Sequence, residues 1–143
     1  MTSPVWLLKP AILAMHAECI ATHGGSDGLR DEGLLDSALA RPAHLHHYEK
    51  ANHWRLAAAY AVGIAKNHPF VDGNKRTAFL AAAVFLERNS LVLTADPGSA
   101  AVFVMGIAAS EVDEAGFAAW LEDHSRQRRR SPLKKQRKKQ PRK

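Results

Sequence analysis

The sequence predicts an all-α fold, a compact bundle of about six helices in which a central pair of buried helices is joined by a polar loop. Three observations lead to this prediction. Apolar residues recur with helical spacing along most of the chain, and two alanine-rich segments are apolar on every side. With 143 residues, of which 46% are hydrophobic, the chain also has the size and the apolar content for one core.

The N-terminal part is predicted to contain two helices. The apolar spacing over residues 10–22 is helical, and the glycine-rich residues 24–28 end this helix in a turn-rich loop. Leucines and alanines share one face over residues 30–40, and Pro42 lies just beyond them, which is typical of the end of a short second helix. Residues 44–52 have no clear period and are expected to be a connection.

The two central helices are predicted from the segments that are apolar on every side. Residues 54–66 are almost all apolar, and their length favours a helix over a strand. This helix has to end near Asn67, because Pro69 disfavours the α conformation in the residue before it and has no amide hydrogen. The second segment spans residues 77–86. Helices of this kind must be buried, so we expect the pair at the centre of the domain.

The remaining part of the fold is predicted to hold two more helices. Residues 91–93 resemble a short strand, but one isolated run cannot make a sheet, so an extended connection is expected. Asp96 followed by Pro97 is typical of a helix start, and this helix should reach about Ala109. Residues 110–113 resemble a capping box with Asp in place of Glu, which predicts the start of a last helix.

Charge divides the chain into two parts. The formal net charge is +6, with 20 basic and 14 acidic residues, but residues 126–143 contain 11 of the Lys and Arg and no acid. Residues 1–125 therefore contain nine basic and 14 acidic residues. We expect a folded domain over 1–125 and a disordered basic tail over 126–143. The tail is suited to nonspecific RNA contact, so a nucleic-acid or ribosome binding protein acting through the tail is one alternative function.

Cysteine content and hydropathy bear on the compartment. The single cysteine, Cys19, cannot form an internal disulfide and is expected to be a small buried thiol. Charged residues interrupt the alanine-rich stretches within about 14 residues, which is too short to span a bilayer. The apolar N-terminus is broken by Pro4, Lys9 and Pro10, unlike a secretory leader. A cytoplasmic protein without a membrane partner is expected.

The polar loop between the central helices is the candidate functional site. Residues 68–76 read HPFVDGNKR. An ordinary solvated turn is the alternative interpretation. Phe70 lies in the middle of the polar residues and would anchor the loop to the core, and unpaired charges next to buried helices cost stability. This placement indicates a function.

The residue types in this loop suit a polyphosphate. Gly73 lets the backbone approach a ligand closely, and the next residues open a helix whose free amide hydrogens favour an anion. Lys75 and Arg76 add two cationic donors in the first turn, where they oppose the helix dipole unless an anion is bound. Asp72 offers a carboxylate oxygen suited to Mg²⁺. His68 is the natural general base, because imidazole titrates near neutral pH.

The loop sequence HPFVDGNKR resembles the Fic/Doc family motif HxFx(D/E)(G/A)N(G/K)R. Residues 28–42 are also similar to the segment that precedes this motif in death-on-curing (Doc) proteins, so the resemblance covers most of residues 5–125. It implies a compact helical Fic/Doc-like catalytic domain. It further implies a toxin of a toxin–antitoxin system, with a cognate antitoxin that blocks the nucleotide or target groove.

Two positions distinguish the branches of this family. Fic proteins generally transfer AMP from ATP to a hydroxyl, and their motif continues GNGRxxR. Here Lys75 replaces the glycine and Phe79 occupies the position of the second arginine. The lysine version resembles Doc toxins, which implies transfer of the terminal phosphate of ATP to a Ser or Thr of a protein. By the same resemblance the target would be a translation elongation factor of the Tu type, and translation would stop. AMP transfer is the alternative.

The resemblance also implies roles for the loop residues. His68 would accept the hydroxyl proton, and Asp72 would hold Mg²⁺. Four residues with the loop amides would bind the phosphates of ATP, namely Gly73, Asn74, Lys75 and Arg76. Lys66 could reach the same phosphates, or it could be a favourable charge at a helix C-terminus.

Two further groups of residues leave alternatives open. Arg30 and Asp31, with the glycines before them, could form a flap that positions the backbone of a target, or they could lie in a plain turn. The glycines concerned are Gly24, Gly25 and Gly28. Histidines 44, 46 and 47 form a loop cluster that could bind a metal, although the spacing of the histidines is not typical of a zinc site.

Overall fold

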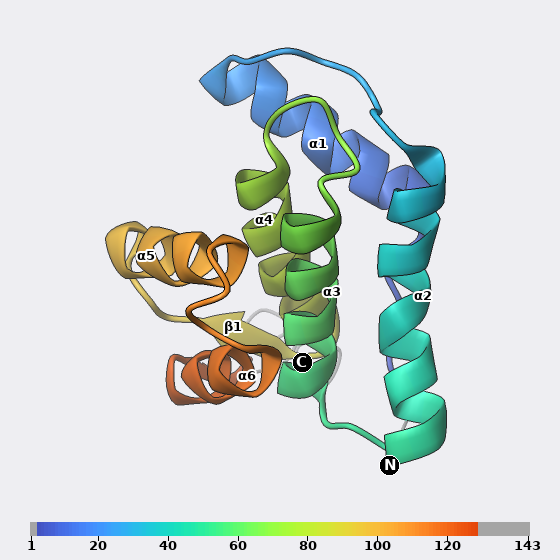
Figure 1. Cartoon of the computed structure of the whole chain (residues 1–143). Coiled ribbons are helices and arrows are strands. Elements are labelled where there is room, and N and C mark those ends of the chain that lie inside the picture. Colours follow the sequence, from blue (N-terminus) through green and yellow to red (C-terminus); the bar gives the residue numbers. More distant parts are fainter. Residues whose placement is uncertain (1–2, 129–143) are drawn as a thin grey trace, which may run out of the picture.

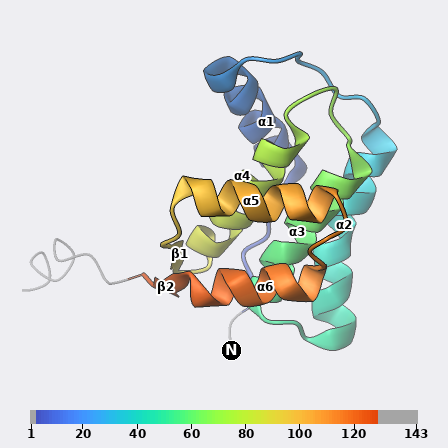
Figure 2. The same ribbon diagram turned by 60° about the vertical axis from the view of Figure 1, so that its left-hand side comes forward.

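The fold is known from a computed structural model that describes residues 3–128, in which six helices form a bundle with a small two-stranded sheet at its edge (Figure 1 and Figure 2). The elements are α1 (Lys9–His23), α2 (Glu32–Glu49), α3 (His53–Asn67), α4 (Asn74–Arg88), β1 (Leu91–Leu93), α5 (Pro97–Ala108), α6 (Glu114–Asp123) and β2 (Ser125–Gln127). The predicted all-α bundle is confirmed. Among the described residues there is no helix with the length and the apolar character that crossing a membrane requires.

Helix α3 is the centre of the bundle, as predicted. It packs against α2, α4, α5 and α6, and its contact with α4 is the most extensive of these. Small residues allow these helices to approach closely: a Cβ built on Gly63 would lie 3.0 Å from the Cβ of Ala38 in α2. The residues of α3 from Leu56 to Ala61 are all buried. The loop that joins α3 to α4 therefore leaves and re-enters the core, and it lies beside the α1–α2 connection in both Figure 1 and Figure 2.

Helix α2 is longer than the sequence predicts. Pro42, expected to lie beyond the helix, is buried inside it, and residues 44–49, expected to be a connection, are helical. Burial of Pro42 and Leu45 explains the difference, since tertiary packing can outweigh the loss of one hydrogen bond at a proline. The helix ends at Lys50, which takes a left-handed conformation with φ 51°.

The expectation that residues 91–93 pair with no other strand was wrong. Leu91 pairs with Gln127 and Leu93 with Ser125, so β1 and β2 form an antiparallel ribbon. The partner strand has the sequence SRQ, which carries no β-pattern, and Ser125 Oγ accepts a 2.7 Å hydrogen bond from the indole of Trp54. Residues 126 and 127, predicted as the start of the tail, thus belong to β2, and residues 129–143 of the predicted tail lie outside the described part.

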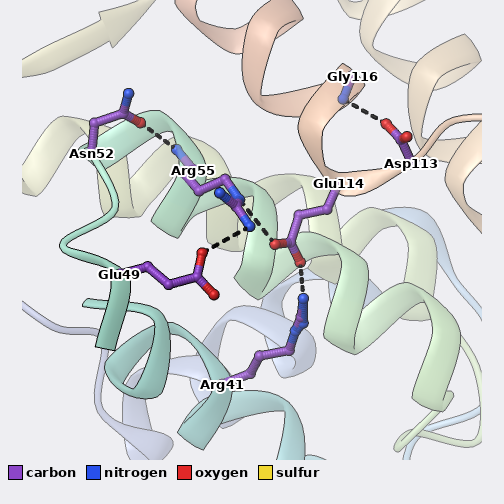
Figure 3. Close-up of polar contacts among 7 residues, drawn as sticks. All are labelled: Arg41, Glu49, Asn52, Arg55, Asp113, Glu114 and Gly116. Carbon is purple, nitrogen blue, oxygen red and sulfur yellow. Dashed lines mark hydrogen bonds and ion pairs between the residues drawn. The ribbon is translucent and has the colours of Figure 1, made fainter. Parts of the chain in front are cut away.

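Helix α6 is tied to α2 and α3 by an ion-pair network (Figure 3). The predicted capping role of Ser110 was wrong: Asp113 caps the helix by accepting a 2.7 Å hydrogen bond from the amide of Gly116. The next residue, Glu114, lies 2.7 Å from Arg41 of α2 and 3.3 Å from Arg55 of α3. The helix therefore starts where its first carboxylate meets two guanidinium groups.

Candidate active site

The loop between α3 and α4 turns through two left-handed residues. His68 ends α3 with φ 49°, and its amide donates to the carbonyl of Ile64. Gly73 precedes α4 with φ 76°. A left-handed residue other than glycine costs about 1 kcal/mol, so the conformation of His68 has to be stabilised by its surroundings.

Residues 28–31 provide much of this stabilisation. The Arg30 guanidinium donates from Nε to the carbonyl of His68 (2.7 Å) and from Nη2 to that of Asn67 (3.0 Å). The amides of Arg30 and Asp31 both donate to the Pro69 carbonyl, at 2.7 and 3.0 Å. This segment is therefore more than a plain turn, because it holds the backbone of the motif loop. A role as a flap for a target stays a prediction.

Asn74 and Phe70 hold the loop from within. Asn74 Oδ1 accepts from the amide of Phe70 at 2.9 Å, and Asn74 Nδ2 donates to the Phe70 carbonyl at 3.0 Å. Phe70 is 1% exposed, so it anchors the loop in the core as predicted. The side chain of Asn74 is thus engaged with the loop, which leaves its backbone amide for a ligand. Asn74 Nδ2 also lies 3.4 Å from His68 Nδ1.

Asp72 presents an ionised carboxylate at the surface of the loop. Its Oδ1 accepts from the amide of Gly73 (2.8 Å) and its Oδ2 from that of Ser26 (3.3 Å). The hydrogen bond from Gly73, then that from Ser26, lowers the pKa of Asp72 below its ordinary value, and the positive charge of Arg76 adds to this. Gly25 lies next to this carboxylate. Its φ of 114° favours glycine, and a Cβ at this position would lie 2.6 Å from Asp72 Oδ2, so the carboxylate would have to move.

This carboxylate fits one side of a Mg²⁺ site. Mg²⁺ usually takes one or two carboxylates together with substrate phosphates and water, which matches a single exposed Asp72. Within residues 3–128, no three His, Cys, Asp or Glu side chains are grouped to hold a metal ion on their own. Histidines 44, 46 and 47 belong to no such group among the described residues.

The N-terminus of α4 is open. Four other helices start with a side chain that accepts a backbone hydrogen bond, and these caps are Asp31, Asn52, Asp96 and Asp113. At α4 the cap position is Gly73, which has no side chain, and the first turn has no acid. Among residues 3–128 no acceptor is bound to the amides of Asn74, Lys75 and Arg76, since the first hydrogen bond of the helix comes from Thr77. Free amides beside two cationic side chains form a site for an anion.

A cavity of about 740 Å³ lies over this helix end. One wall consists of the motif residues His68, Val71, Asp72, Gly73, Asn74, Lys75 and Arg76. The rest of the lining is largely apolar and comes from α1, α4 and α5, with the residues Cys19, His23, Phe79, Leu80, Ala100, Ala101, Val104 and Met105. Its size is that of a site for a small organic ligand, about 300–1,000 Å³. A cavity that combines a charged part with an apolar part suits a nucleotide, because the charged part can bind the phosphates and the apolar part the base.

Six of the seven predicted site residues thus line one cavity, and Lys66 does not. The Lys66 ammonium group donates to Ser110 Oγ at 2.6 Å, at the end of α5. It also lies in the last turn of α3, where a cation is favourable. The sequence did not reveal the apolar wall from α5 or the buried His16 under the loop. In the sequence these residues lie on apolar helix faces, and such positions cannot be told apart from ordinary core positions.

The fold and the site define a class of small helical proteins in which an HxFxDGNKR loop joins two buried helices and opens onto an anion site. The model of the Fic/DOC family matches residues 6–86, more than half of the chain. The chain is 32% identical over 111 residues to Protein kinase doc of Escherichia phage P1, which covers 77% of this chain and 87% of that protein. It is 48% identical over 75 residues to Toxin Doc of Mycolicibacterium smegmatis, over 51% of this chain and 58% of the relative.

The chain therefore belongs to the Fic/DOC family. Its similarity to a Doc toxin and to a Doc kinase supports a Doc-type toxin and a Fic-like transferase. The match with the mycobacterial toxin spans a little under three fifths of that protein.

Proposed function

We propose that this chain is a Doc-type toxin that transfers the terminal phosphate of ATP to a Ser or Thr hydroxyl of a protein. The observation that carries the proposal is the meeting of three groups at one cavity: the open N-terminus of α4, the ionised Asp72 and the exposed imidazole of His68. A phosphoryl transfer enzyme needs charge stabilisation and positioning more than covalent chemistry. These groups can supply both.

The residues divide the work as follows. The α4 amides, with Lys75 and Arg76, bind the phosphate oxygens and stabilise the charge on them. Asp72 would hold Mg²⁺ together with the phosphates, and the ion would neutralise negative charge there. The acceptor oxygen forms a bond to the terminal phosphorus while the bond to the bridging oxygen breaks and ADP leaves. His68 takes the hydroxyl proton.

Phe79 favours transfer of the terminal phosphate over transfer of AMP. It stands where adenylylating relatives have a second arginine, and it contributes an apolar surface to the cavity wall. An apolar surface cannot clamp the β- and γ-phosphates in the orientation that AMP transfer needs. The printed name of the phage P1 relative, a protein kinase, supports the same choice.

Labelled ATP tests the proposal. The protein is incubated with cell extract, Mg²⁺ and ATP labelled at either the γ- or the α-phosphate, with His68→Ala as the inactive control. We expect transfer of the γ-label to one main protein, and loss of this transfer in the control. Transfer of the α-label alone would replace the kinase by an adenylyltransferase.

The target and the partner are part of the proposal. We infer that the substrate is a translation elongation factor of the Tu type and that its modification arrests translation in the cytoplasm. A cognate antitoxin would cover the cavity and keep ATP or the target out, which the names of the Doc relatives support. Purified elongation factor should replace the extract in the labelling assay. Expression of the chain alone should stop growth, and co-expression of the adjacent small gene should restore it.

The basic segment gives a second, weaker interaction. Residues 126–143 carry 11 of the Lys and Arg and no acid, which favours nonspecific contact with RNA. If RNA binding were the main function, removing this charge would abolish toxicity and His68→Ala would leave it intact. The enzyme proposal predicts the opposite pattern.

A further inference from the structure

His16 is a buried histidine that contacts the motif loop from α1. It is 3% exposed, and its Nε2 lies 2.8 Å from the backbone carbonyl oxygen of Asp72. Because a carbonyl can only accept, Nε2 carries the proton and donates it. The ring also stacks on Phe70, with 3.8 Å between ring centroids and 6° between the planes. His16 thus holds the loop by a hydrogen bond and by a ring face.

The hydrogen bond from His16 sets the direction of one peptide group. In a trans peptide the C=O and the N–H point in opposite directions, so turning the carbonyl of Asp72 toward α1 turns the amide of Gly73 away from it. That amide donates to Asp72 Oδ1 at 2.8 Å. The hydrogen bond from His16 to the Asp72 carbonyl therefore orients the Gly73 amide, and this amide in turn holds the Asp72 carboxylate.

The packing around this peptide leaves it little freedom to rotate. A Cβ on Gly73 would lie 3.2 Å from Ile20 Cδ1 and 3.7 Å from the His16 ring. Arg30 holds residues 67 and 68, and the Asn74 side chain holds Phe70. The Ser26 amide holds the Asp72 carboxylate through Oδ2 and does not contact the Asp72–Gly73 peptide. Among the described residues, His16 supplies the hydrogen bond to the carbonyl of Asp72.

We propose that His16 is a positioning residue for the transfer reaction: its Nε2–H fixes the Asp72–Gly73 peptide, so that the Asp72 carboxylate and the α4 amides face the phosphates and the cation together. This inference rests on the proposed function. A histidine that only fills the core is the competing interpretation. The two differ in which property of the ring matters, the N–H donor or the apolar bulk.

Two substitutions separate these properties. His16→Gln places an amide N–H near the position of Nε2 but loses the stacked ring, whereas His16→Phe keeps a ring on Phe70 and leaves the Asp72 carbonyl without its donor. His44→Gln and His44→Phe are the matched controls, since His44 is exposed on α2. All four variants are measured below their melting temperatures.

Activity is the first readout. For His16→Phe we expect kcat for transfer of the γ-label to fall on the order of 10- to 100-fold, as for a buried acceptor left unsatisfied, while His16→Gln stays within about threefold of the wild type. Equal activities of the two variants, both normal or both lost, would overturn the proposal. If His16→Phe does not fold, His16→Met, of similar length and without a donor, takes its place.

Binding is the second readout and needs no turnover. Calorimetry with a non-hydrolysable ATP analogue, with and without Mg²⁺, should show that His16→Phe loses most of the Mg²⁺-dependent gain in affinity and that His16→Gln keeps it. Nitrogen-15 spectra of the wild type should show a protonated His16 Nε2. Normal Mg²⁺-dependent binding by His16→Phe, or an unprotonated Nε2, would contradict the positioning role. If the wild type transfers neither label, the proposed function fails, and these two measurements still test His16.

Discussion

Replacing Glu114 by Gln should destabilise the fold without touching the candidate site. Glu114 is the first residue of α6, its side chain is 11% exposed, and it faces Arg41 and Arg55 from two other helices (Figure 3). Glutamine has nearly the same shape and no charge. The substitution therefore leaves two guanidinium groups beside a neutral amide and tests the ion pairs alone.

The expected loss is about 1–2 kcal/mol of unfolding free energy. Breaking a fully buried pair costs about 3–5 kcal/mol, but Arg41 and Arg55 are 43% and 36% exposed, so water compensates for part of the loss. The geometry also limits the gain: Glu114 Oε1 lies 2.7 Å from Arg41 Nη2, yet the contact lacks the angles of a hydrogen bond. For a chain of this length the loss corresponds to a fall of about 3–8 °C in Tm.

Urea and thermal unfolding measure this effect, with Glu122→Gln as the control because Glu122 is exposed on the same helix. The difference between wild type and Glu114→Gln should shrink in high salt, which screens partly exposed charges. A stability change within about 0.5 kcal/mol, or one equal to that of Glu122→Gln, would show that the network contributes nothing measurable.

Three further perturbations have defined outcomes. Gly25→Ala should lower transfer by up to about 100-fold by displacing Asp72. Gly24→Ala, where φ is also positive but the space around the Cβ is open, should lower stability only; steady-state kinetics and melting curves of both variants check this. Burial, then the charge of His46, lowers the pKa of His53, so protonation of His53 lowers the unfolding free energy of the protein as pH falls below about 6.5. In urea titrations, His53→Gln should therefore reduce the loss of unfolding free energy between about pH 7.5 and 5.5. An unchanged loss would contradict the assignment to His53. Removing residues 129–143, with nine Lys and Arg, should leave Tm and γ-label transfer unchanged and abolish salt-sensitive retention on RNA; a loss of transfer would place this segment in the enzyme.

The elements that the sequence predicts well are those whose signal is local. The central helices are apolar on every side, and Pro69, the second residue of the motif, ends the first of them at Asn67. Where tertiary contacts decide, the prediction is wrong. Pro42 stays inside α2 because its burial compensates for a missing amide, and β2 has a polar sequence that becomes a strand only because β1 lies beside it.

The candidate site follows the same rule. His68, Asp72, Lys75 and Arg76 could be grouped in advance because they are adjacent in sequence and their chemistry is unusual between two apolar helices. Lys66 is as close in sequence but points to Ser110, since two residues along a helix turn a side chain to another face. His16 was missed because a histidine on an apolar helix face looks like core until the residue across from it is known.

The motif loop separates its backbone into a held part and an open part. The carbonyls of residues 67–70 and of Asp72 all accept hydrogen bonds, from Arg30, Asp31, Asn74 and His16. The amides of residues 74–76 have no partner within residues 3–128 and lie at the cavity. Turning carbonyl groups inward and amide groups outward makes this end of α4 electropositive before Lys75 and Arg76 are counted. Three polar side chains and one loop are used to hold these carbonyls. The stability of the fold does not require this arrangement, whereas anion binding at the helix end explains it.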